Sequence, residues 1–417
     1  MDHSSSHLDQ ISARSDTADE LVDILRSVRL CVCCGAGGVG KTTTSAALAL
    51  TGARLGLRVL ALTIDPSKRL AQTLGVARNT PEPVELDRAR LSALGVPEEG
   101  SLSAWLLDPK LVSDQVVHRE AGQDAEALKQ NPMYREISGM VAGMQEYTAV
   151  EALHSFLKSG AYDLIVLDTP PSRHALRFID SPQRVAAFLD KRIFHLFVPS
   201  QTGLIGRVAS RLVDEVLDRA FGEEPRRELK QFFELFSRLL DHLNTNQKEM
   251  SNIFQSDDVR FFMVTTARLD AVDEAQTFAG ETQRRGLHLG GFFLNRCPPS
   301  EVDYADTTLV QDTSSNSSDE IIRDVDQIET QLVARLESAR AALTEQASST
   351  PELTSQVSQL LSDRIYQQAQ AVALRRETAQ ALRERGDLYR LKELTIDAAS
   401  LEGISALADQ LMGVKTR

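Results

Sequence analysis

Short apolar runs alternate along the chain with longer segments whose apolar residues recur at helical spacing. A continuous apolar run of five to nine residues, roughly strand length, is typical of a strand that is buried on both faces of a parallel sheet. Six runs predict strands, at 28–34, 57–65, 162–168, 259–267, 289–295 and 388–394. Helix-forming segments separate these runs. The pattern therefore predicts an α/β fold with a mainly parallel central sheet flanked by helices.

Two long segments between the predicted strands, at about 100–160 and 183–257, have helical periodicity. In the second, apolar residues recur three and four positions apart, as in Leu229, Phe233, Phe236 and Leu240. These segments predict an inserted α-helical subdomain beside the sheet. Their apolar faces fit either packing of helix on helix or a hydrophobic groove for a client or partner.

Two further segments are polar and carry no periodicity. Residues 1–20 predict a disordered N-terminal tail, and residues 305–320 predict an acidic, Ser-rich loop. The remaining chain, 21–417, reads as one domain with the helical insertions inside it. No apolar run approaches the length of about eighteen residues that spans a membrane. The N-terminus lacks the pattern of a secretory signal.

Composition and charge restrict the class of partner. The chain has 417 residues, of which 42% are hydrophobic and 25% charged, so it can form a sizeable core. Its formal net charge of −13 disfavours a general binder of nucleic acid or of anionic membranes, because both are polyanions. We therefore expect no nucleic-acid partner.

The four cysteines predict neither a disulfide framework nor a zinc site. Cys31, Cys33 and Cys34 lie on the strand before a glycine-rich turn, and Cys297 stands apart. Zinc would need a second matching pair of ligands, which the sequence does not offer, so no zinc is expected. Buried thiols on a central strand, in a reducing cytoplasm, are the better interpretation.

The turn after the first predicted strand carries the clearest chemical signal. Residues 35–42, GAGGVGKT, match the phosphate-loop pattern G-x-x-x-x-G-K-[ST] between an apolar strand and a helix former. In this pattern backbone N–H groups surround phosphate oxygens, Lys41 reaches the β- and γ-phosphates, and the Thr42 hydroxyl can bind Mg²⁺. The predicted ATP-binding residues of the loop are Gly35, Gly37, Gly38, Val39, Gly40, Lys41, Thr42 and Thr43.

Two aspartates end predicted strands near this loop. Asp168 follows four apolar residues in LIVLD, the form of a strand whose carboxylate binds the metal directly or through water. Asp65 ends the second predicted strand, at the sheet edge where ligands bind in open α/β sheets. From spacing alone, Asp65 fits a residue that activates water or a cap of the turn before Pro66.

Together these motifs resemble the arsenite-pump and tail-anchored-protein-targeting ATPase family, within the SIMIBI class of P-loop NTPases. GAGGVGKTTT resembles the family's phosphate loop, TIDPSKRLAQTLG its switch I, and DTPPSRHALRFID its switch II. GFFLNRCPP resembles the strand whose asparagine reads adenine. Together with AGMQEYTAVEAL, these motif sequences are most similar to those of actinobacterial members, which tend to occur as paired paralogues.

The resemblance implies a cytoplasmic, ATP-driven homodimer, or a heterodimer with a paralogous ATPase. Closure around ATP and Mg²⁺ would remodel the inserted helices, which would hold a hydrophobic protein or a membrane-associated client. By the same match Asp65 and Lys41 are catalytic, Thr42 and Asp168 serve the metal, and Asn295 contacts adenine. For His174 and Arg177, a relay from switch II and ordinary packing both remain open.

The sequence departs from the family pattern at Ala36, where the resemblance leads us to expect a lysine that crosses to the partner's phosphates. We expect a working ATPase whose missing charge comes from Lys68, from Arg69 or from a non-identical partner. The alternative is an ATP-binding regulatory subunit that does not hydrolyse and pairs with an active paralogue. The cysteine sets that bind zinc or arsenite in the family are absent from the sequence.

Overall fold

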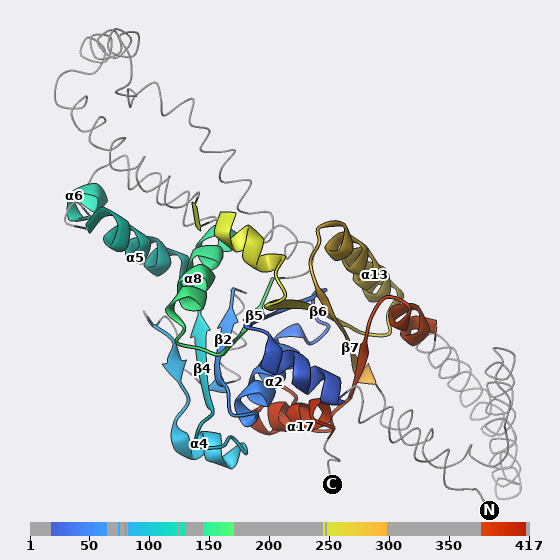
Figure 1. Ribbon diagram of the computed structural model, residues 1–417. Coiled ribbons are helices and arrows are strands. Elements are labelled where there is room, and N and C mark those ends of the chain that lie inside the picture. The colour runs from blue at the N-terminus through green and yellow to red at the C-terminus, as the bar shows by residue number, and fades with distance from the viewer. Residues whose placement is uncertain are drawn as a thin grey trace, which may run out of the picture.

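The computed structural model describes residues 18–64, 74–75, 80, 82–122, 125–130, 145–170, 245–246, 248–297 and 377–413. Within them, an eight-stranded sheet is covered by helices (Figure 1). The strands are β1 Leu30–Gly35, β2 Arg58–Thr63, β3 Val84–Glu85, β4 Ser101–Leu106, β5 Leu164–Asp168, β6 Val259–Thr265, β7 Leu289–Cys297 and β8 Leu388–Lys392. The principal helices are α2 Lys41–Arg54, α4 Arg88–Ala93, α5 Pro109–Ala121, α6 Ala125–Gln130, α8 Gln145–Ser159, α13 Leu269–Arg284 and α17 Leu401–Leu411.

The sheet is parallel except at one edge. The strands lie in the order β3-β4-β2-β5-β1-β6-β7-β8, and only the β3–β4 pair is antiparallel. The mainly parallel sheet and all six predicted strands are therefore confirmed. Strand β1 lies in the middle, between β5 and β6. The chain leaves β1 toward β2 on one side and later returns to build β6 on the other, so the loop after β1 lies at a topological switch point.

One strand lies where the sequence predicts only helices. Residues 101–106 form β4, which pairs with β2 over its whole length. The helical part of the predicted 100–160 segment begins at Pro109, with α5, and continues through α6 and α8. The strand was missed because its sequence, SLSAWL, contains no β-branched residue and directly precedes helix formers. Of the predicted 183–257 segment, only 245–246 and 248–257 are described, and residues 248–254 are helical.

Two hydrophobic clusters, one on each face of the sheet, form the core. Successive side chains of β1 alternate between them, because strand residues point to opposite faces in turn. Val32 and Cys34 join the cluster beneath α8 and α13, whereas Cys31 and Cys33 join the cluster beneath α2 and α17. Burial on both faces explains why these strands read as continuous apolar runs rather than as alternating ones.

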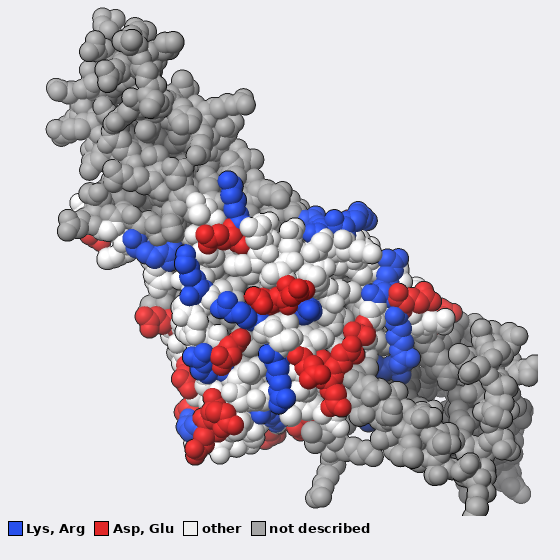
Figure 2. Space-filling view, in the orientation of Figure 1, with Lys and Arg blue, Asp and Glu red and all other residues white. Residues whose placement is uncertain are grey.

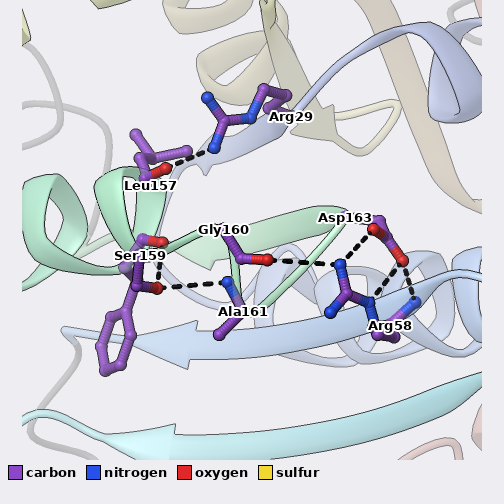
Figure 3. A network of polar contacts seen from close by, with 8 residues as sticks. Arg29, Arg58, Leu157, Ser159, Gly160, Ala161 and Asp163 are labelled. Carbon is purple, nitrogen blue, oxygen red and sulfur yellow. Dashed lines mark hydrogen bonds and ion pairs between the residues drawn. The ribbon is translucent and has the colours of Figure 1, made fainter.

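Ion pairs and turn contacts fix the end of α8 to the N-terminal ends of β1 and β2 (Figure 3). The Arg58 guanidinium donates to both carboxylate oxygens of Asp163, at 3.0 and 2.7 Å, and to the Gly160 carbonyl oxygen at 3.2 Å. The Arg58 backbone N–H also donates to Asp163. Arg29, directly before β1, donates to the carbonyl oxygen of Leu157. The turn that leads into β5 is thus held in register with its two neighbours.

The described surface carries mixed charge. On the face drawn in Figure 2, acidic and basic side chains are interspersed over the described residues. Among the described helices, none has the length and apolar character needed to cross a membrane. The predicted tail at 1–20 lies largely, and the loop at 305–320 entirely, outside the described residues.

Candidate nucleotide site

The loop between β1 and α2 has a backbone that requires glycine at defined positions. At Gly35, a methyl group would lie 2.4 Å from the backbone carbonyl oxygen of Val264 on β6. Gly40, the N-cap of α2, has φ of 92°, a conformation that L side chains rarely adopt. A methyl group there would also lie 2.1 Å from the side-chain nitrogen of Asn295. The loop is therefore fitted against β6 on one side and β7 on the other.

The middle of the loop is open. A methyl group on Gly37 or Gly38 would meet no described heavy atom within 4 Å, and both residues are exposed. Ala36 is only partly buried and packs against the cluster beneath α2. Val39 is buried and anchors the loop in the hydrophobic core. A loop fixed at both ends and open between them can receive a phosphate group.

The N-terminal end of α2 has features that favour the binding of an anion. Across the described loop and the first turn of α2, no side chain caps the helix and no acidic residue is present. The first backbone bond into the helix is donated by Thr44 N to the Gly40 carbonyl oxygen, at 2.9 Å. The N–H groups of Lys41, Thr42 and Thr43 precede that bond and can meet phosphate oxygens at the positive end of the helix dipole.

The Asp168 carboxylate lies directly beside the loop. It ends β5 and is fully buried, and strand pairing places it next to Cys33 on β1. The Thr42 hydroxyl donates to Asp168 Oδ2 at 2.8 Å. The Lys41 ammonium, only 6% exposed, lies 3.9 Å from Oδ1. A buried carboxylate is costly unless charge and hydrogen bonds compensate it, and Lys41 and Thr42 provide both.

These groups fit a magnesium ion. Hydroxyl and carboxylate oxygens are the ligands that Mg²⁺ prefers, and it binds through one or two such groups together with phosphates and water. Thr42 and Asp168 offer this set beside an open loop with uncapped N–H groups. Among the described residues there is no group of three or more histidines, cysteines or acids suited to a metal, so the described protein ligands alone would not complete the site.

Asn295 contacts the phosphate loop itself. Its side-chain nitrogen donates to the Val39 carbonyl oxygen at 2.9 Å, and its oxygen accepts from the backbone N–H of Arg296 at 2.9 Å. Arg296 has φ of 59°, the left-handed region, which turns the chain at this point. The sequence predicts contact between Asn295 and adenine, and that contact stays a prediction. The contact with Val39 was not predicted.

The cysteines are packed in the core as free thiols, and all four are buried. Burial raises the pKa of Cys33 and of Cys34 to about 12, and the pKa of Cys31 well above its ordinary value. A thiol with so high a pKa is a poor nucleophile and a poor metal ligand. The interpretation of buried thiols on a central strand is therefore confirmed.

Several predicted residues lie outside the described part of the chain: Asp65, Lys68, Arg69, His174 and Arg177. The structure does, however, describe Thr63, two residues before Asp65, and its hydroxyl contacts Asp168. The sequence analysis missed Thr63, although a polar residue ending an otherwise apolar strand at the sheet edge was a usable signal.

A glycine loop between a central parallel strand and a helix, with its lysine and threonine at the carboxylate of the neighbouring strand, defines a P-loop nucleoside-triphosphate-binding protein. The family model described as anion-transporting ATPase matches residues 28–329. The chain belongs to this family of ATPases, which confirms the resemblance drawn from the motifs.

Curated relatives share moderate identity with the chain. The ATPase get3 of Schizosaccharomyces pombe is 31% identical over 157 residues, which is 38% of this chain and 44% of that protein. A putative arsenical pump-driving ATPase of Halobacterium salinarum is 30% identical over 177 residues, 42% of this chain and 26% of that protein. A putative arsenical pump-driving ATPase 1 of Aquifex aeolicus is 27% identical over 288 residues, 66% and 65% respectively. The match to the first of these thus spans less than half of the relative's length.

Proposed function

We propose that the chain binds Mg·ATP at the loop 35–42 and hydrolyses it. The observation that carries this proposal is the meeting of Lys41 and Thr42 at the buried carboxylate of Asp168, beside an open glycine loop. The loop and the start of α2 would surround the phosphates with backbone N–H groups. Thr42 and Asp168 would hold Mg²⁺, which would supply positive charge to neutralise the charge that develops on the phosphates.

Each described side chain has a role that follows from its position. Lys41 would leave Asp168 to contact the β- and γ-phosphates, because a phosphate offers the ammonium a more negative partner. Thr42 would offer an oxygen lone pair to the metal while its O–H still donates a hydrogen bond to Asp168. Asp65 would orient or deprotonate the attacking water, an assignment that comes from the family resemblance.

The hydrolysis cycle would move the inserted helices. Helix α8 runs directly into β5, which ends at Asp168, and the helix at 248–254 runs directly into β6. Two polar contacts join α8 to the segment that precedes β6: Asn246 donates to both carboxylate oxygens of the buried Glu151, at 3.3 and 3.0 Å, and His154 lies 2.8 Å from the exposed Glu249. A change at the phosphates could reach the helices through these short connections. The cargo would be a partner or a hydrophobic client, held by a homodimer or a heterodimer.

Ala36 supports a second candidate. Since the charge expected at this position is missing, the chain could bind ATP as a regulatory subunit and leave hydrolysis to an active paralogue. Trans-acting cations of this kind contribute on the order of 10³-fold or more to turnover, so their loss has a large effect. Lys68 or Arg69 would compensate under the first candidate and would be dispensable under the second.

The test is equilibrium binding of Mg·ATP beside steady-state hydrolysis. Lys41→Ala should weaken binding and abolish turnover, because the ammonium contacts the phosphates. Lys158→Ala is the matched control, since Lys158 is an exposed residue in the last turn of α8, away from the loop. Equal loss in both variants, or no loss in either, would contradict the proposed site.

A further inference from the structure

The Thr63 side chain lies against the proposed metal ligand. Thr63 ends β2 and is paired with Asp168 in the parallel β2–β5 register, so their side chains share one face of the sheet. The Thr63 hydroxyl donates to Asp168 Oδ2 at 3.2 Å. Both residues are buried, with 1% and 0% of their surface exposed.

Two hydroxyls therefore hold one carboxylate oxygen. Oδ2 of Asp168 accepts from Thr42 on α2 and from Thr63 on β2, while Oδ1 faces Lys41. A hydroxyl has one proton and two lone pairs. Thr42 can donate its O–H hydrogen bond to Asp168 and keep its lone pairs for a cation, but only if the accepting oxygen stays where it is. Thr63 lies on β2, whereas Thr42 lies on α2, and the Thr63 hydrogen bond fixes the position of that oxygen.

We propose that Thr63 is a positioning residue of the metal site: it fixes the Asp168 carboxylate, which in turn aims the Thr42 hydroxyl at Mg²⁺. The inference rests on the proposed function, because it concerns Mg²⁺ bound together with ATP. Thr63 itself contacts neither metal nor nucleotide. Thr63 acts through Asp168. Its loss should reduce the part of ATP affinity that Mg²⁺ provides and should leave the contacts of the loop with the phosphates unchanged.

The position does not need threonine for the fold alone. The rest of β2 after Arg58 is Val-Leu-Ala-Leu, and the strand is buried throughout those residues. Valine has the same shape as threonine and suits a buried strand as well or better. Outer-shell partners that orient a metal ligand cost roughly 10- to 100-fold in metal affinity when removed. We expect a loss of about tenfold for Thr63, since Thr42 remains a second donor to the same oxygen.

The experiment measures how much Mg²⁺ tightens ATP binding. The dissociation constant of a fluorescent ATP analogue is measured with saturating Mg²⁺ and again with EDTA, and the ratio is the metal enhancement. Thr63→Val removes the hydroxyl at constant shape, and Thr63→Ser restores it without the methyl group. A second pair, Thr63→Ala against Thr63→Ser, isolates the hydroxyl if the valine variant fails to fold. Thr51→Val is the matched control, because the buried Thr51 hydroxyl bonds only locally in α2, to the Ala47 carbonyl oxygen.

The proposal predicts that Thr63→Val and Thr63→Ala lower the metal enhancement about tenfold while the constant in EDTA stays within about twofold. Thr63→Ser and Thr51→Val should keep the enhancement of the unaltered chain. Equal weakening of binding with and without Mg²⁺ would overturn the proposal, because that is the effect of a purely structural hydroxyl. An unchanged enhancement in Thr63→Val would overturn it as well. If the unaltered chain itself shows no metal enhancement, the proposed function fails, which is a different result.

Discussion

The side-chain amide of Asn295 is hydrogen-bonded to the Val39 carbonyl oxygen at 2.9 Å and ties the end of β7 to the phosphate loop. Val39 is buried, and the neighbouring Gly40 has no room for a side chain because Asn295 occupies the space. The loop is therefore held by a residue that lies 256 positions away in the chain. Its shape depends on β7 as well as on its own glycines.

Removal of the Asn295 amide should weaken binding of any polyphosphate. Asn295→Ala leaves the Val39 carbonyl oxygen without this donor, a change that costs about 1–3 kcal/mol for a buried group. We expect about tenfold weaker binding of both ATP and inorganic triphosphate. Asn252→Ala, at an exposed asparagine of the helix 248–254, is the control. If only ATP binding falls and triphosphate binding does not, Asn295 acts on adenine instead of on the loop.

Gly40→Ala should abolish nucleotide binding. The added methyl group would lie 2.1 Å from Asn295, and φ of 92° is unfavourable for alanine, so the loop must shift. Gly286→Ala separates these two causes, because Gly286 also has positive φ, 67°, but has no described atom within 4 Å of the added group. We expect Gly286→Ala to lower the free energy of unfolding by about 1–2 kcal/mol and to leave ATP binding unchanged. Retained binding in Gly40→Ala would disprove the required fit of the loop.

Loss of the Asp163 carboxylate should destabilise the chain in a pH-dependent manner (Figure 3). The hydrogen bonds from Arg58 hold the pKa of Asp163 below its ordinary range. The folded state thus binds the proton less readily than the unfolded state, so this stabilisation is present above the ordinary aspartate pKa of about 4 and is lost as the pH falls below it.

Asp163→Asn should therefore lower the free energy of unfolding at pH 7 by about 1 kcal/mol or less, because the pair is well exposed to solvent. The difference from the unaltered chain should shrink as the pH falls toward 4 and below. Chemical denaturation at several pH values measures it, and Asp23→Asn, at an exposed aspartate of the helix 18–27, is the control. A difference that grows toward low pH would contradict the assigned direction of the pKa shift.

The cysteines should resist thiol reagents until the chain unfolds. With a pKa of about 12 for Cys33 and Cys34, the thiolate fraction at pH 8 is on the order of one in ten thousand, and burial blocks access. A chromogenic disulfide reagent should label none of the four thiols rapidly in the native chain and all four in denaturant. Rapid native labelling would mean that β1 opens, or that β7 opens if the labelled thiol is Cys297.

Much of this architecture is readable from the sequence because the central strands are buried on both faces. The continuous apolar runs at 28–34 and 162–168 predict β1 and β5, and the glycine pattern predicts the loop between β1 and α2. Strand β4 was not predicted because its sequence contains no β-branched residue and the segment after it is helical. It is a strand because it pairs along the whole of β2.

The contacts that shape the site are harder to predict than the motif. The approach of Asn295 to Val39 depends on how β7 lies beside β6, and the contact between Thr63 and Asp168 on the register of β2 against β5. Both are relations between distant segments, and a local pattern such as the polar Thr63 at a strand end does not say which residue it contacts. Sequence motifs predict the residues that would meet the nucleotide, while the structure adds residues that contact them, Thr63 and the Asn295–Val39 pair.

The most direct test of the central claim is steady-state hydrolysis of Mg·ATP by the purified chain, with ATP binding followed in parallel. The account predicts turnover by the unaltered chain, and binding without turnover by Asp65→Asn. ATP binding with no turnover in the unaltered chain would contradict it. In that case the chain alone is not the enzyme, and a partner must supply the charge that is missing at Ala36.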